Sequence, residues 1–105
     1  MEIKHTSHRG TSPDTVGDAL AALRQLFEHR TAEEPVSIPD FWRFLRERGF
    51  YFVENGPFGR LGKVIDSDPR VETWGVYFAR LMLDHAVELG LIRRGRTAET
   101  YIAKG

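Results

Sequence analysis

The residues best suited to bind an anion lie close together near the end of the chain. Residues 93–104 hold Arg93, Arg94, Arg96 and Lys104 against the single carboxylate of Glu99. Clustered arginine and lysine side chains neutralise phosphate groups, so this segment is a candidate contact for a phosphodiester backbone. The whole chain, however, has 15 basic and 15 acidic residues and no formal net charge, unlike many small nucleic-acid binders. Any such contact must therefore be local.

A glycine-rich stretch over residues 56–63 is the second candidate for phosphate binding. Its backbone amides and Lys63 could cradle a phosphate, but the spacing differs from that of a phosphate-binding loop, and Val64 replaces the magnesium-binding hydroxyl. Residues 59–62 are also similar to the GxxG loop of KH domains, although the sequence Asp-Ser-Asp-Pro over residues 66–69 would interrupt the helix that should follow. We interpret these glycines as parts of a helix or a turn.

Residues suited to catalysis or metal binding are sparse. The chain has no cysteine, no Gly-x-Ser-x-Gly element and no nucleophile beside a base. His5 and His8 lack a third and a fourth ligand, and Asp66 and Asp68 are better explained as caps of the next helix. We therefore predict no enzyme activity, no metal site and no cofactor.

Length and composition favour one domain. With 105 residues, of which 41% are hydrophobic, the chain can build one modest core. We expect residues 1–11 to be a flexible tail, or at most a short edge strand, and residues 12–105 to form a single domain. No apolar run approaches the roughly 20 residues of a membrane span. Together with the absence of cysteine, this predicts a cytoplasmic protein.

Two helices are expected in the N-terminal half. The first starts at Ser12-Pro13-Asp14, continues to about residue 29 and has an apolar stripe formed by Val16, Leu20, Leu23 and Phe27. The second has Ser37 as its N-cap and proline in its first turn. Gly49 predicts a left-handed stop after Arg48.

The C-terminal half is expected to hold two more helices and a hairpin. Residues 50–53 form an aromatic run that fits a short strand or a buried extended connection. Phe58, Leu61 and Ile65 predict a short third helix over residues 57–65. A long fourth helix begins at Pro69 or Thr73 and ends before Gly90, and the residues after it alternate as in a hairpin. The core face of the long helix is predicted to hold Val71, Trp74, Phe78, Leu81, Met82, His85 and Leu89.

The order of short helix, turn, long helix, glycine stop and basic hairpin over residues 57–105 resembles the end of a winged helix-turn-helix domain. The resemblance implies a mainly helical α+β fold of about four helices with a C-terminal two-stranded hairpin. In that family the helix before the hairpin enters the major groove, and the hairpin, or wing, touches the phosphate backbone. It therefore implies a small non-enzymatic regulatory protein that binds double-stranded DNA. Carried over to this chain, the groove residues are Arg70, Thr73, Tyr77 and Arg80, and the wing residues are Arg93, Arg94 and Arg96.

Two features of the long helix keep another function open. Its exposed stripe becomes acidic at Asp84 and Glu88, where phosphate would be repelled. A second apolar line, formed by Val76, Leu83 and Val87, exceeds what one small core needs and predicts an interface with a protein partner or a second copy. The chain would then be an interaction or adaptor domain of the same shape without nucleic-acid binding. Alternatively, the rest of the chain buries this line.

Overall fold

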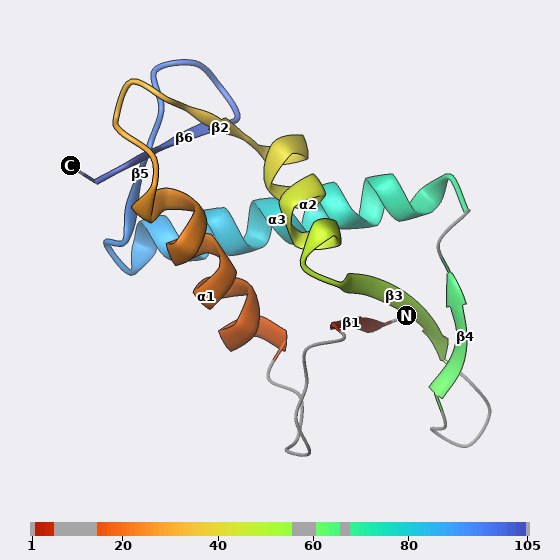
Figure 1. Ribbon diagram of the computed structural model, residues 1–105. Coiled ribbons are helices and arrows are strands. Elements are labelled where there is room, and N and C mark those ends of the chain that lie inside the picture. The colour runs from red at the N-terminus through yellow and green to blue at the C-terminus, as the bar shows by residue number, and fades with distance from the viewer. Residues whose placement is uncertain (1, 6–14, 56–60, 66–67, 105) are drawn as a thin grey trace.

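The computed structural model describes residues 2–5, 15–55, 61–65 and 68–104, which form a mainly helical α+β fold (Figure 1). The elements follow in the order β1 (Glu2–His5), α1 (Thr15–Glu28), β2 (Val36–Ser37), α2 (Ile38–Glu47), β3 (Phe50–Asn55), β4 (Leu61–Ile65), α3 (Arg70–Glu88), β5 (Ile92–Arg94) and β6 (Thr100–Ala103). Three described helices and a C-terminal antiparallel hairpin are loosely consistent with a winged helix. No described helix is long and apolar enough to cross a membrane.

Two three-stranded antiparallel sheets lie towards opposite ends of α3 (Figure 1). The sheet near its N-terminal end has the strand order β1-β3-β4, and Ile3 is opposite Phe52 in the register of β1 and β3. The sheet near its C-terminal end has the order β2-β6-β5, and Val36 is opposite Tyr101. Each sheet therefore joins segments that are far apart in the sequence.

The two N-terminal helices are present, and α2 shows the predicted caps. The hydroxyl oxygen of Ser37 accepts a hydrogen bond from the backbone N–H of Asp40 at 3.2 Å, and a proline stands in the first turn. Gly49 has a φ of 89°, the left-handed conformation that ends a helix. The predicted start of the first helix, residues 12–14, lies outside the described residues, and α1 is observed from Thr15.

The predicted third helix over residues 57–65 is wrong. Residues 61–65 form strand β4, in which Ile65 is opposite Phe52 of β3, while residues 57–60 lie outside the described part of the chain. Val64 and Ile65 are β-branched and glycine weakens a helix, so a paired strand is favoured once β3 supplies a partner. The aromatic run is accordingly a strand, and residues 2–5 form an edge strand beside it.

The core face of α3 is rotated away from the predicted one. Leu81 and Leu89 are 46% and 53% exposed, and the His85 side chain is also partly exposed, whereas the residues that are buried include Gly75 and Ala79. A Cβ atom placed on Gly75 would lie 2.0 Å from Cε2 of Trp42. Small residues, and not the largest apolar ones, therefore mark the line along which α2 and α3 approach each other.

Gly75→Ala should lower the free energy of unfolding by about 2–3 kcal/mol, because the added methyl group overpacks against Trp42. Elsewhere in a helix the same change stabilises by up to about 1 kcal/mol, so the sign of the effect is diagnostic. Chemical denaturation measures it. Thr73→Ala, on the exposed side of the same helix, should change the value by less than about 0.5 kcal/mol. A Gly75→Ala chain as stable as the unmodified one would contradict the close packing.

Candidate nucleic-acid interface

The hairpin β5–β6 lies beside the C-terminal half of α3 and is bonded to it through polar side chains. Asp84 is at the centre of this contact: one carboxylate oxygen accepts a hydrogen bond from the hydroxyl of Tyr101 at 2.5 Å and lies 3.1 Å from Nη2 of Arg94. Nearer the turn of the hairpin, Nη2 of Arg80 lies 2.5 Å from Oε1 of Glu99. These bonds fix the position of the hairpin relative to α3.

Tyr101 is the buried member of this cluster. Its side chain is only 2% exposed, and the guanidinium carbon of Arg94 lies 5.8 Å from the centroid of its ring. Burial, followed by the hydrogen bond to Asp84, raises the pKa of the Tyr101 phenol above its usual value. The hydroxyl therefore keeps its proton, and remains a donor to Asp84, over the physiological pH range.

The four predicted groove residues share the exposed side of α3, but both arginines already have carboxylate partners. Nε and Nη2 of Arg70 lie 3.1 and 2.7 Å from Oδ2 of Asp68, and Arg80 is paired with Glu99. The side-chain and backbone hydrogen bonds of Arg70 lower the pKa of the Asp68 carboxyl. Thr73 and Tyr77 are exposed but uncharged. This side of α3 therefore presents little uncompensated positive charge.

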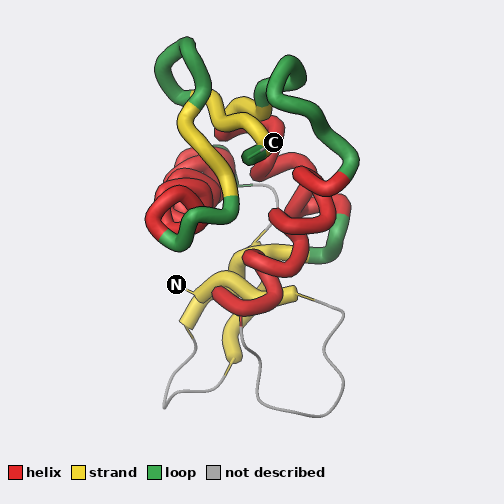
Figure 2. Tube along the Cα trace, turned by 90° about the vertical axis from the view of Figure 1, so that its left-hand side faces the viewer, coloured by secondary structure: helices red, strands yellow, loops and turns green. Residues whose placement is uncertain are grey.

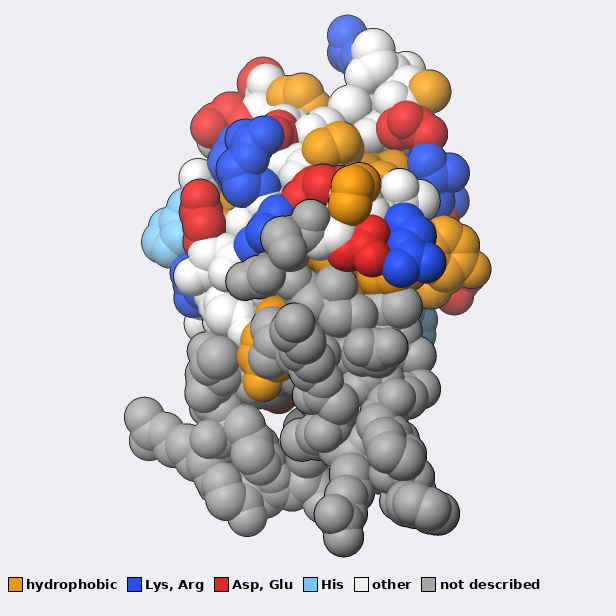
Figure 3. Space-filling model, turned by 90° about the vertical axis from the view of Figure 1, so that its right-hand side faces the viewer, with side chains coloured by type: hydrophobic (Ala, Val, Ile, Leu, Met, Phe, Trp, Pro, Cys, Tyr) orange, Lys and Arg blue, Asp and Glu red, His pale blue; other side chains and the backbone are white. Residues whose placement is uncertain are grey.

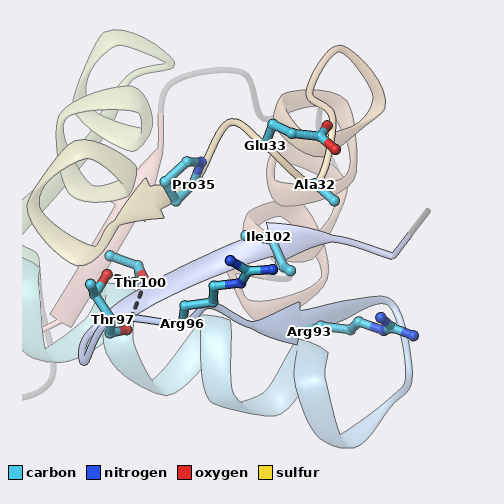
Figure 4. A pocket seen from close by; sticks show the side chains of 8 residues that line it. All are labelled: Ala32, Glu33, Pro35, Arg93, Arg96, Thr97, Thr100 and Ile102. Atoms are coloured by element: carbon cyan, nitrogen blue, oxygen red, sulfur yellow. Dashed lines mark hydrogen bonds between the residues drawn. The ribbon is translucent and has the colours of Figure 1, made fainter.

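The three predicted wing arginines are divided between two faces of the hairpin. Alternate residues of a strand point to opposite faces. Ile92 is buried and Arg94 reaches Asp84 beside α3, so Arg93, between them, points to the outer face of the sheet. Arg96 joins Arg93 on this outer face (Figure 4). Among the described residues, neither Arg93 nor Arg96 forms an ion pair.

An open groove of about 660 Å³ separates this outer face from the connector between α1 and β2 (Figure 4). Ile102 and Thr100 of β6 line it from one side, and Pro35 and Glu33 of the connector line it from the other. Its two guanidinium groups and one carboxylate give the groove a positive lining. Away from it the charges are mixed: acidic and basic side chains alternate over the described part of the face drawn in Figure 3.

Packing within the chain accounts for the apolar line that was a predicted partner interface. Leu83 is fully buried, while Val76 and Val87 are half-buried and pack against the core. Helix α1 contacts α3. Leu83 is therefore a core residue that no partner of the folded chain can reach. The large exposed apolar residues are instead Tyr77 and Leu81 of α3, and Leu89 directly after it.

No family model, curated protein or solved structure matches this chain. Over residues 2–5, 15–55, 61–65 and 68–104, no three His, Cys, Asp or Glu side chains come together as a metal site would require. The sequence did not indicate the two polar contacts between α3 and the hairpin, which are the bonds of Asp84 to Tyr101 and Arg94 and the bond of Arg80 to Glu99. Only the alternation of residues 100–103, which places Tyr101 and Ala103 inside, is a signal that could have indicated them.

Tyr101→Phe should lower the free energy of unfolding by about 1–2 kcal/mol, because it removes the donor to Asp84 and keeps the ring. Chemical denaturation measures the change. Tyr77→Phe is the matched control, since the Tyr77 side chain is 63% exposed and its hydroxyl is available to water. Equal effects of the two substitutions would contradict a stabilising bond between Tyr101 and Asp84.

The raised pKa of Tyr101 also predicts a loss of stability at alkaline pH. The folded chain holds this proton more tightly than the unfolded chain. The contribution is therefore complete below the unfolded pKa of tyrosine, about 10, and is lost as the pH rises through the higher folded value. Tyr101→Phe should make the fall of unfolding free energy above pH 10 less steep. Denaturation at a series of pH values tests this expectation.

Proposed function

We propose that the chain is a small non-enzymatic regulatory protein whose winged-helix-like module binds double-stranded DNA along the hairpin. The observation that carries the proposal is the pair of arginines, Arg93 and Arg96, that lines the outer face of the hairpin without an ion pair among the described residues. Guanidinium groups bind phosphate oxygens through parallel hydrogen bonds. The edge formed by Arg93 and Arg96 is therefore the contact with the DNA backbone.

The position of the hairpin supports this proposal. Helix α3 passes into β5 through Gly90, which has a φ of 76°, and the bonds of Asp84 and Arg80 hold the hairpin beside the helix. A hairpin fixed in this way loses little conformational entropy when it binds. The chain also resembles the winged helix-turn-helix family in the order of its long helix, glycine stop and basic hairpin.

The charges of α3 limit how much its exposed side can contribute to DNA binding. Arg70 and Arg80 are paired with carboxylates, while Asp84 and Glu88 repel phosphate. Phosphate contacts position a protein on DNA without reading its sequence. The proposed binding is therefore weak, sensitive to salt and largely independent of sequence, with about two counterions released at the two hairpin arginines.

Replacing both Arg93 and Arg96 by alanine should remove most of the affinity for duplex DNA and leave the fold intact. Fluorescence anisotropy of a labelled duplex over a salt series measures this binding. The slope of log affinity against log salt should become shallower by about two, because two phosphate contacts are lost.

The matched control replaces Arg30 and Arg43, exposed arginines outside the groove, by alanine and changes the net charge by the same amount. It should bind almost as well as the unmodified chain. If the unmodified chain shows no salt-sensitive binding even at low ionic strength, the proposed function is lost. An equal loss of affinity in the control would show that overall charge attracts the DNA and that Arg93 and Arg96 form no specific contact.

A further inference from the structure

One line of side chains on α3 stays exposed after the rest of the described chain has packed against this helix. It consists of Arg70, Tyr77, Leu81 and Glu88, here called the outer line. At 100° per residue these four positions fall within about 40° of one another around the helix axis. Tyr77 is 63% and Leu81 46% exposed, and Arg70 and Glu88 are more exposed still. The outer line is thus a polar–apolar–polar strip along the whole helix.

The outer line lies on the surface of the described fold. Figure 2 looks nearly along α3 and shows it at the outer side of the described fold, with the hairpin above it and β1 below it. Tyr77 and Leu81 also border an apolar groove of about 290 Å³, whose other lining residues include Trp74 and Phe78. An exposed tyrosine and leucine beside an apolar groove mark a surface suited to contact with protein.

The charges of the outer line would match those of a second outer line that runs in the opposite direction. Its N-terminal end is basic at Arg70, its C-terminal end is acidic at Glu88, and its centre holds Tyr77 and Leu81. Positions 70 and 88 have their midpoint at residue 79, and so do positions 77 and 81. A single twofold axis at Ala79 would therefore place Arg70 opposite Glu88, and Tyr77 opposite Leu81, in both halves of a symmetric contact.

From this complementarity we propose that a second copy of the chain packs its α3 antiparallel against the outer line. Helix axes that pack together lie about 8–10 Å apart, a separation that the Tyr77 and Leu81 side chains can fill. Arg70 can keep its bond to Asp68 and still face Glu88 of the second copy, since its side chain is 71% exposed. The contact is isologous, so each copy buries the same residues.

Other occupants fit the outer line less well. An acidic peptide or DNA would be attracted by Arg70 but repelled by Glu88 and Asp84 near the other end, and a basic peptide would meet the opposite mismatch. A second copy in the antiparallel arrangement places an opposite charge at both ends of the outer line. The chain also has 15 basic and 15 acidic residues, so two copies do not repel each other through net charge. This dimer goes beyond the proposed DNA binding and does not depend on it, because Arg93 and Arg96 lie outside the outer line.

Leu81→Asp tests the apolar centre of this contact. Sedimentation equilibrium over a range of concentrations should show the 12.0 kDa chain passing into a species of twice that mass. Leu81→Asp should raise the dimer dissociation constant at least about tenfold, because it places two carboxylates at the centre of the interface. Val16→Asp is the matched control, since Val16 is 45% exposed on α1 and lies outside the outer line. It should leave the dissociation constant unchanged.

A charge exchange tests the antiparallel arrangement even if Leu81→Asp fails to fold. Arg70→Glu alone and Glu88→Arg alone should each weaken the dimer, because each places like charges opposite one another. Both substitutions in one chain should restore it, and a mixture of the two single variants should form a mixed dimer. Each substitution suits the helix, because a carboxylate is favoured in the first turn and a cation in the last.

A chain that stays monomeric at every concentration would overturn the proposal. A dimer that neither Leu81→Asp nor the charge exchange weakens would also overturn it, as would a monomer that uses Tyr77 to bind an unrelated protein. The chain with alanine at positions 93 and 96 should keep its dimeric mass. Loss of DNA binding and loss of self-association are therefore separate outcomes, and failure of either proposal leaves the other intact.

Discussion

The contact between Trp42 and Gly75 determines how the rest of the structure is arranged. Trp42 is 1% exposed, its ring packs 5.6 Å from that of Phe52, and α3 can approach it only because Gly75 has no side chain. The indole N–H of Trp42 has no acceptor among the described residues, a penalty that this close packing must offset. The contact fixes the rotation of α3, which turns Leu83 into the core and Tyr77 towards solvent.

The same rotation gives the C-terminal hairpin its place. Asp84 lies between the core side and the solvent side of α3, where the hydroxyl of the buried Tyr101 can reach it. With Tyr101 directed inwards, strand alternation directs Arg94 to Asp84 and leaves Arg93 on the other face. Arg94 thus holds the hairpin on α3, whereas Arg93 and Arg96 face the groove on the other side. The edge formed by Arg93 and Arg96 and the outer line of α3 are consequently different surfaces, and occupation of one does not require the other.

Local signals predicted the elements that local interactions determine. Ser37 and Gly49 mark the ends of α2 in the sequence as in the structure, because a cap acts within a few residues. The helix expected over residues 57–65 is instead partly strand β4, because its pairing partner lies in β3 and apolar spacing alone does not distinguish a short strand from a helix. The rotation of α3 also could not be predicted, since hydrophobicity gives no weight to Gly75. The residues of the candidate site were predicted without their partners. The carboxylates that neutralise Arg80 and Arg94 are brought to them by tertiary contacts, whereas Arg70 is paired locally with Asp68.

The acidic residues that weaken the case for a DNA-reading helix have other uses in this fold. Asp84 is bonded to Tyr101 and Arg94, so its charge serves to position the hairpin, and Glu88 supplies the end of the outer line that complements Arg70. In the proposed dimer α3 would therefore be an assembly helix and the hairpin the contact with DNA. A single edge of two arginines binds phosphate weakly, but a dimer has two such edges, and the second binds at the high effective concentration set by the first. Self-association through a neutral surface is thus a physical means by which a chain without net charge could bind a polyanion.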